Sequence, residues 1–445
     1  MNRSDVAVIG AGLCGLTSAL FLAREGHEVT VYEQCGEPGG QLAVLQQNGV
    51  ERFYHHLFRT DHRLLTLLDS FPTPVPVRWY RSNSACWSEG RSYPLNTPLE
   101  LVLGNLLPPL AAVRASLATA ALRITGNHPL FDQCSARALL TATMGPATTD
   151  RFWLPQLEAK FGTHWQDISA AWMVGRLLVR ARSRGPLGWY EVLGYPVGGF
   201  GRLLEALLKE LRRLGVRLRV RCPVLGLEPG GRGGTRLQLA QSSIDHQAVL
   251  SSVPSTTLAS LCPRFPLLQQ RLCATPHRSV VCACFFLDRQ LSPHYWISVL
   301  APGTLPNVVV EHTNLLPPED YAGRHIVYAA RYLDPNDPLA SAPDERVLEV
   351  LSEGLATVLP HFRNCTVEQA TLSRVREAHS VMKRGHYSRI PPLRPGWDSL
   401  FVACTAQVFP SDRSLDEAVR LAEGACRAIG QFLDRPENPG TSTPP

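Results

Sequence analysis

Residues 6–40 read VAVIGAGLCGLTSALFLAREGHEVTVYEQCGEPGG, and this stretch decides the fold. The run VAVI is apolar throughout, as in a strand buried in a parallel sheet. Gly10, Gly12 and Gly15 follow with the spacing G-x-G-x-x-G, and a helix and a second strand ending in Glu33 come next. Gly10 permits a tight turn, Gly12 lets a pyrophosphate approach the backbone, and Gly15 lets the helix pack closely against the strand.

The acid at the end of the second strand defines the ligand further. The carboxylate of Glu33 can accept hydrogen bonds from both ribose hydroxyls of an adenosine, while the helix N-terminus faces the phosphates. A carboxylate there disfavours a 2′-phosphate and therefore NADP. The order strand, glycine turn, helix, strand and acid within one unit predicts a dinucleotide site.

A second glycine pair, Gly39-Gly40, follows the acid and is not needed for NAD. The pattern resembles the second phosphate-and-ribityl turn of flavoproteins of the amine oxidase, protoporphyrinogen oxidase and phytoene desaturase superfamily. Those proteins usually carry an Arg after the pair, whereas this chain has Gln41. Segments 193–228 and 399–426 resemble later flavin-binding elements of the superfamily, and others resemble a mostly bacterial, amine-oxidase-like branch. The resemblance implies an FAD-dependent oxidoreductase.

The resemblance also implies which residues contact FAD. Val224 stands where the family's adenine-facing strand lies, and Thr405, Asp412 and the backbone N–H of Ala418 belong to the closing flavin element. Cys14 is expected to pack against the sheet, without a covalent flavin bond. The predicted FAD-binding residues are Gly10, Gly12, Leu13, Cys14, Gly15, Glu33, Gln34, Gly39, Gly40, Gln41, Val224, Thr405, Asp412 and Ala418.

The predicted fold class is α/β, with a Rossmann-type FAD-binding domain of the glutathione-reductase-like kind and an inserted α+β substrate domain. Segments 280–288 and 325–333 read as strands of the substrate domain. The FAD-binding domain is expected to be discontinuous, the substrate domain to fill the gaps, and the tail to be disordered. The predicted ranges are 1–75, 194–256 and 370–435 for the first, 76–193 and 257–369 for the second, and 436–445 for the tail.

Flavin chemistry needs few protein side chains, because the ring itself takes the hydride or electron pair. His55 and His56 are candidates for a proton relay or a flavin contact, and Tyr387 and Arg389 for flanking the ring or holding an anionic group. The polar residues 311–314 could serve a pocket or only end a strand. Trp172 and Arg176 are one helical turn apart in the insert, where packing is the alternative to substrate contact.

Composition limits the partners. The 445-residue chain has a formal charge of +6, with basic residues spread along it, so no nucleic acid is expected. Its twelve cysteines form no CxxC pair, which predicts no metal site and favours reduced thiols in a cytoplasmic protein. The apolar segment 101–123 is interrupted by prolines and an arginine. We expect it to be a buried helix, with peripheral membrane contact as the alternative.

Three functions fit these observations. The first is an oxidoreductase that moves a hydride from a C–H bond of an apolar or amine-bearing small molecule to flavin N5, with O₂ or another acceptor reoxidising the flavin. The second is a flavin-dependent mutase without net redox change, of the UDP-galactopyranose mutase type, for which Arg389, Arg394 and Tyr387 would hold a diphosphate. The third is a binding module without flavin, which the intact glycines and Glu33 disfavour.

Overall fold

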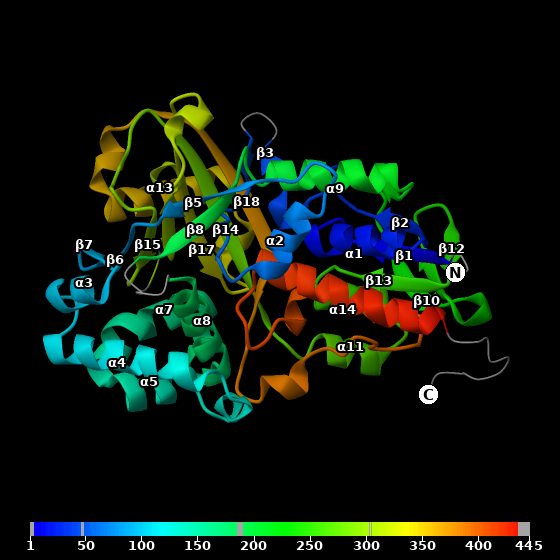
Figure 1. The fold of residues 1–445 in the computed structure, drawn as a ribbon, viewed down its shortest axis with the longest axis horizontal. Helices are drawn as coiled ribbons and strands as arrows, with labels where there is room; N and C mark the ends of the chain where they lie inside the picture. The colour runs from blue at the N-terminus through cyan, green and yellow to red at the C-terminus, as the bar shows by residue number, and fades with distance from the viewer. Residues whose placement is uncertain (1–3, 46–48, 185–189, 302, 304, 435–445) are drawn as a thin grey trace.

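The computed structural model describes residues 4–45, 49–184, 190–301, 303 and 305–434, so the tail 436–445 lies outside the described residues. Figure 1 shows two parts of the molecule. One part holds a parallel sheet with its covering helices, and the other holds a larger sheet and a group of helices.

The parallel sheet has the order β19-β13-β1-β2-β9, and all its neighbouring strands run in the same direction. The quoted stretch supplies β1, α1 and β2 as predicted, and Glu33 is the first residue after β2. This arrangement confirms the α/β class with a Rossmann-like parallel sheet. The bounds are Asp5–Ile9 for β1, Glu28–Tyr32 for β2, Arg217–Arg219 for β9, Ala248–Ser251 for β13 and Leu400–Val402 for β19.

Successive residues of the strands point to opposite faces of this sheet. Val6 and Val8 pack against helices α1 (Leu13–Arg24), α9 (Gly201–Arg213) and α14 (Leu415–Leu433). Ala7 and Ile9 face the other side, where a small antiparallel sheet and two short helices cover the strands. These elements are β10 (Gly226–Pro229), β11 (Thr235–Gln238), β12 (Ser243–His246), α10 (Ser255–Leu261) and α11 (Pro266–Leu272).

The second sheet has seven strands in the order β18-β14-β17-β16-β15-β6-β7. The predicted strands 280–288 and 325–333 are β14 and β17, which pair antiparallel in its centre. Helix α13 (Asp344–Val358) packs on one face, while the other face joins the core of the parallel-sheet part. The strands are β6 (Ser84–Ser88), β7 (Arg91–Pro94), β14 (His277–Leu287), β15 (Trp296–Val299), β16 (Val308–Glu311), β17 (His325–Leu333) and β18 (Val367–Ser380).

Strand β18 runs past residue 370, where we placed the return to the FAD-binding domain. Because β18 pairs with β14 over most of its length, residues 370–380 lie with the seven-stranded sheet. The β8 strand (Val192–Pro196) similarly pairs with β5 (Val77–Arg81), which connects the two parts. Three short elements follow the glycine turns in the sequence: the strands β3 (Val44–Leu45) and β4 (Val50–Glu51) and the helix α2 (His62–Asp69).

The helical insert has its own core, in which Phe161 and Trp172 are buried. Its helices are α3 (Pro98–Leu103), α4 (Pro109–Thr125), α5 (Ala136–Met144), α6 (Pro146–Thr148), α7 (Leu154–Phe161) and α8 (Ala170–Ser183). None of the helices within the described ranges combines the length and apolar character that crossing a membrane requires.

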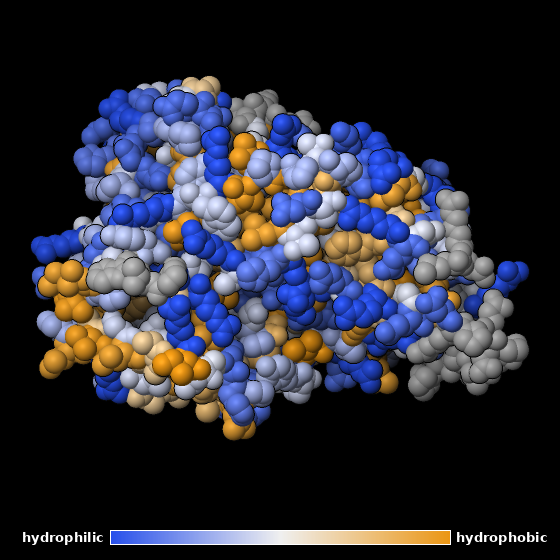
Figure 2. Space-filling view, in the orientation of Figure 1, coloured by the Kyte–Doolittle hydropathy of each residue, from blue (hydrophilic) through white to orange (hydrophobic). Residues whose placement is uncertain are grey.

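The expectation of a buried helix over 101–123 is wrong for most of α4. Only Ala112, Ala115 and Leu122 of this helix are buried, because small residues form the side that meets its neighbours. Leucine and isoleucine side chains face solvent instead: Leu110 is 86% exposed, Leu117 67% and Ile124 88%. Figure 2 shows apolar side chains gathered at the lower left, where Figure 1 places α3 and α4.

Candidate functional site

The first glycine turn has the geometry that a pyrophosphate requires. Helix α1 begins at Leu13. Its first backbone hydrogen bond runs from the N–H of Leu16 to the carbonyl of Gly12. A Cβ on Gly12 would meet no atom within 4 Å, so its surface is open to a ligand. A Cβ on Gly15 would lie 2.0 Å from the carbonyl oxygen of Gly10, so only glycine permits this helix-to-strand approach.

The carboxylate of Glu33 is fixed beside this turn. Its Oε2 accepts a hydrogen bond from the N–H of Ala11 and its Oε1 accepts one from the N–H of Cys35, both at 2.8 Å. Two oxygens of a carboxylate offer about four acceptor positions, so acceptor capacity remains for ribose hydroxyls. The backbone of Cys222 also reaches this place, because its N–H donates to the carbonyl of Glu33 at 2.8 Å.

The second glycine turn lies directly on the first. The N–H of Gly39 donates to the carbonyl of Ala11 at 2.7 Å, and a Cβ on Gly40 would lie 3.2 Å from the Cα of Gly12. Gly39 has a φ of 122° and Gly40 a φ of 56°, in the region that favours glycine. These contacts make one continuous backbone surface from the two turns, which fits the diphosphate of a dinucleotide.

Arg413 occupies the place next to Gln41. Its Nη1 donates to Oε1 of Gln41 at 2.8 Å, and its Nη2 lies 3.3 Å from the hydroxyl of Tyr332 on β17. A guanidinium from the closing segment therefore lies beside Gln41, the position where the resemblance leads us to expect an Arg. Sequence analysis missed Arg413, although it follows the predicted Asp412 directly.

The remaining predicted cofactor residues surround these turns. Leu13 is buried, Cys14 contacts the carbonyl of Ala403, and Gln34 is exposed. Burial raises the pKa of the Cys14 thiol to about 12, so it stays protonated at neutral pH. Val224 is half-buried in the connection between β9 and β10 and packs against the core under the sheet.

The closing segment differs in detail from the expectation. Thr405 begins a short 3₁₀ turn after β19, and Ala418 lies in the first turn of α14. Ser414 caps this helix, since its Oγ accepts from the N–H of Glu417 and its carbonyl from the N–H of Ala418. The N–H of Ala418 is therefore used by the chain itself and is not a free donor for phosphate.

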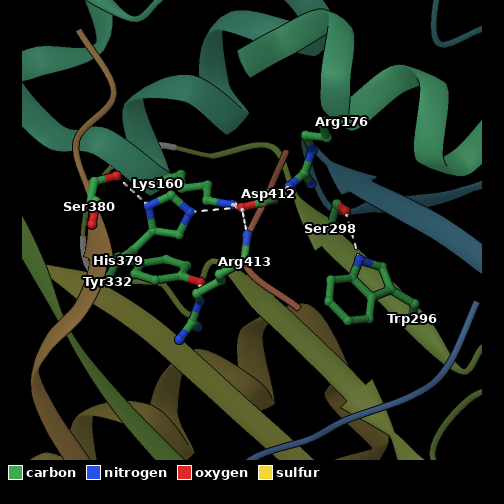
Figure 3. A network of polar contacts seen from close by, with 9 residues as sticks. All are labelled: Lys160, Arg176, Trp296, Ser298, Tyr332, His379, Ser380, Asp412 and Arg413. Atoms are coloured by element: carbon green, nitrogen blue, oxygen red, sulfur yellow. Dashed lines mark hydrogen bonds and ion pairs between the residues drawn. The ribbon is translucent and has the colours of Figure 1, made fainter. Parts of the chain in front are cut away.

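Asp412 is the centre of a buried polar network (Figure 3). One carboxylate oxygen lies 2.7 Å from Nζ of Lys160 and 2.9 Å from Nη1 of Arg176. The other oxygen lies 2.9 Å from Nε2 of His379 at the end of β18. Asp412 thus holds together side chains from α7, α8 and the seven-stranded sheet, and the sequence predicted none of these contacts.

The charges in this network shift each other's titration. Burial alone would raise the pKa of Asp412, but Lys160, His379 and Arg176 hold it well below its ordinary value. Burial lowers the pKa of Lys160 to about 7, against the opposing attraction of Asp412. His379 is neutral, because burial and the nearby Lys160 lower its pKa to about 3. Lys160 is therefore the group of the network that titrates near neutral pH.

A cavity of about 50 Å³ adjoins the network, compared with the roughly 10–15 Å³ that one ordered water needs. Arg176 connects the two, because it lines the cavity and binds Asp412. A smaller neighbouring cavity reaches Lys160 and Trp172. The larger one is lined on its apolar side by Phe152, Trp153, Leu177 and Trp296, and on its charged side by Arg176, Arg180, Arg184 and Glu191.

His55 and His56 lie in the extended segment between β4 and α2. The imidazole of His56 lies 3.2 Å from the hydroxyl of Tyr295 and meets the Trp296 ring edge-on at 5.8 Å, which places it behind the cavity wall. Among the described residues, Nδ1 of His55 has no hydrogen-bond partner. Burial lowers the pKa of His55 to about 4 and that of His56 to about 3, so both are neutral at pH 7.

Tyr387 and Arg389 make their contacts elsewhere. Tyr387 is 45% exposed and its ring packs on Phe409 at 4.8 Å, while Arg389 donates to the carbonyl of Arg384 at 3.1 Å. The structure does not bring either side chain to the cavity lining. Their roles in catalysis stay predictions.

The polar residues after β16 have a structural use. Glu311 is fully buried and accepts from the N–H groups of Leu291 and Ser292 at 2.6 and 2.9 Å. His312 lies 2.7 Å from the hydroxyl of Tyr321 in the core. Trp172 is a core residue, whereas Arg176 beside it reaches both Asp412 and the cavity.

One signal in the sequence pointed to the cavity. Arg176 and Arg180 are four residues apart, which puts them on one face of α8, and Arg184 follows at the same spacing directly after the helix ends. Lys160 and His379 gave no comparable signal, because each reaches Asp412 only through tertiary packing.

Known proteins resemble this chain over most of its length. The model of the flavin-containing amine oxidoreductase family matches residues 13–429. A hydroxyneurosporene desaturase of Cereibacter sphaeroides is 29% identical over 303 residues, which is 57% of this chain and 57% of that protein. The chain thus spans little more than half the length of this curated relative.

Solved structures share the fold at low identity. A protein from an Exiguobacterium species named as a protoporphyrinogen oxidase has a TM-score of 0.75 at 18% identity, covering 98% of this chain and all of that one. Cyclohexylamine oxidase of Brevibacterium oxydans has a TM-score of 0.74 at 14% identity with the same coverage. A reduced UDP-galactopyranose mutase has a TM-score of 0.73 at 14% identity, covering 97% and 95%.

The two glycine turns and Glu33 fit FAD, and the family match extends from the first turn to the end of α14. The chain therefore belongs to the flavin-containing amine oxidoreductase family.

Proposed function

We propose that this protein oxidises a C–H bond of a small molecule with an apolar body, which binds in the cavity beside Asp412. One observation carries the proposal: a continuous series of contacts from the second glycine turn to the cavity. Gln41 binds Arg413 at 2.8 Å, Asp412 is the next residue, and Asp412 binds the cavity-lining Arg176 at 2.9 Å. Bound FAD supplies a hydride acceptor at N5, and O₂ or another acceptor reoxidises it.

The protein's own residues bind and orient the substrate. Phe152, Trp153 and Trp296 give the cavity an aromatic wall that packs an apolar body and excludes water. Lys160, whose pKa burial lowers to about 7, is suited to hold or release a proton at Nζ. His56 packs against Trp296 of this wall, and His55 and His56, both neutral at pH 7, remain our candidates for a flavin contact.

The visible absorption spectrum of the purified protein tests the proposal first. Oxidised flavin peaks are expected, and their absence after reconstitution with FAD would contradict it. Anaerobic photoreduction followed by O₂ then separates the acceptors. Fast reoxidation indicates an oxidase, and very slow reoxidation indicates a dehydrogenase or a mutase.

The mutase alternative keeps one supporting observation, although not from the arginines first considered. Arg394 packs over Phe401 and Phe432, and Arg389 binds a carbonyl, so neither lines the cavity. The arginines of α8 could hold a diphosphate instead. Isomerisation of a sugar nucleotide by the photoreduced protein, with no net consumption of reductant, would favour this function.

Peripheral membrane contact through α4 is a further part of the proposal. It is supported by the exposed Leu110, Leu117 and Ile124 on one helix. Cosedimentation with phospholipid vesicles tests it, and Leu117→Ser together with Ile124→Ser should abolish binding without loss of flavin. The twelve free cysteines support a cytoplasmic location.

A further inference from the structure

Arg176 and Arg180 of α8, and Arg184 directly after the end of this helix, line the cavity in greater number than acids do. Arg176 is bound to Asp412, but Arg180 and Arg184 form no ion pair among the residues that the structure describes. Glu191 is the acid that lines the same cavity, and its buried Oε1 has no hydrogen-bond partner there either. The guanidinium of Arg180 lies 5.9 Å from the centre of the Trp296 ring, so its plane adjoins the aromatic wall.

Positive charge is in excess around the cavity. Three arginines line it, Arg176, Arg180 and Arg184, against one acid, Glu191. The oxygens of Asp412 are already occupied by Lys160, Arg176 and His379, so Asp412 does not pair with Arg180 or Arg184. Burial lowers the pKa of Arg180, against the opposing attraction of Glu191.

This excess of positive charge makes the binding of a cationic ligand in the cavity unfavourable. A protonated amine would bring a third unpaired positive charge into a cavity whose available acceptors are few. An oxyanion would instead bind in the plane of the guanidinium through paired hydrogen bonds, which are among the stronger polar contacts in proteins. The adjacent Trp153 and Trp296 favour an apolar or aromatic body attached to that anion.

We propose that the substrate carries an oxyanion, a carboxylate or a phosphate, on an apolar body, and that Arg180 is the specificity-determining residue that binds this anion. This inference rests on the proposed function, because it names the substrate class of the same cavity.

The experiment compares three probes of similar shape and different charge on the FAD-loaded protein: benzoate, phenyl phosphate and benzylamine. Calorimetry gives the affinity, and perturbation of the flavin spectrum reports binding near the cofactor. We expect at least one anion to bind about tenfold or more tightly than benzylamine. Tighter binding of benzoate would indicate a carboxylate substrate, and tighter binding of phenyl phosphate would indicate a phosphate.

Variants locate the binding group. Arg180→Met should weaken anion binding by about tenfold or more, and Arg180→Lys should weaken it less, since the charge is kept. Arg182→Met is the matched control, because Arg182 is exposed on the same helix and does not line the cavity; it should change affinity by less than about twofold. The flavin spectrum of each variant confirms that it is folded.

Two results would overturn the inference: benzylamine binding as tightly as both anions, or Arg180→Met binding anions as well as Arg182→Met does. Neither result affects the flavin spectrum or its photoreduction. Failure of the proposed function would show in those two measurements, so the two failures can be told apart.

Discussion

The nucleotide turns and the Asp412 network, which we propose are two halves of one site, are built in different ways. At the turns, backbone groups do the binding, and Gly12 and Gly15 act through the absence of a side chain. At the network, long charged side chains from α7, α8, β18 and the closing segment meet at one carboxylate. The first design leaves a local pattern in the sequence, whereas the second depends on packing between distant segments.

Glycine-to-alanine substitutions test the backbone half and should have the largest effect. Gly15→Ala places a Cβ 2.0 Å from the carbonyl oxygen of Gly10, so the free energy of unfolding should fall by about 4 kcal/mol or more. Gly12→Ala meets no atom within 4 Å and should fold normally while losing FAD affinity. Denaturant unfolding and FAD titration measure the two effects.

Gly424→Ala is the matched control for these variants. Gly424 lies inside α14 with nothing within 4 Å of a Cβ, so alanine there should stabilise the helix by about 0.5–1 kcal/mol. If Gly12→Ala retained full FAD affinity, the open space at the turn would not be the pyrophosphate site.

Asp412→Asn tests the side-chain half. Removal of this charge leaves Lys160 and Arg176 facing each other in a largely buried place, so the free energy of unfolding should fall by about 3 kcal/mol. Asp245→Asn removes the partner of Arg236 at the surface and should leave the thermal midpoint nearly unchanged. Equal effects of the two substitutions would show that the network does not hold the insert in place.

The two halves also differ in how far sequence could predict them. The sequence pattern of 6–40 predicted the strand, the turn and the position of Glu33, because each follows from local backbone requirements. It did not predict that His379, at the end of a strand of the seven-stranded sheet, meets Asp412. Nor did the apolar run 101–123 reveal that α4 turns Ala112 and Ala115 inward and exposes Leu110 and Leu117, since that choice depends on the neighbouring helices.

A buried histidine in the core that joins the two halves, His312, should make the stability of the protein depend on pH. Burial lowers the pKa of His312 to about 3, so the folded protein keeps this imidazole neutral while the unfolded chain binds a proton below about pH 6.5. The contribution of His312 to the free energy of unfolding is therefore fully present above that pH and is lost as the pH falls. The loss at pH 5 is about 2 kcal/mol.

Thermal midpoints of the parent and of His312→Gln, measured from pH 8 to pH 5, test this sign. The variant should show a shallower decline, because one proton-binding site is absent from the unfolded chain. His361→Gln, which changes an exposed histidine, is the control and should follow the parent. A steeper decline in His312→Gln than in His361→Gln would contradict the assignment.

The smallest expected effect lies where the two halves meet, at Gln41 and Arg413. Family resemblance alone suggests that Gln41→Arg would restore a usual flavin contact and tighten FAD binding. The structure predicts the reverse, because the guanidinium of Arg413 already lies 2.8 Å from Gln41 and a second one would repel it. Gln41→Arg should therefore weaken FAD binding by about threefold to tenfold. The double variant Gln41→Arg, Arg413→Gln should recover much of that affinity, since it exchanges the two side chains across the same contact. Fluorescence titration of the apoproteins with FAD measures the affinities of the parent, the single variant and the double variant. Tighter FAD binding by the single variant would contradict this prediction. It would mean that Gln41 in the turn and Arg413 in the closing segment act independently.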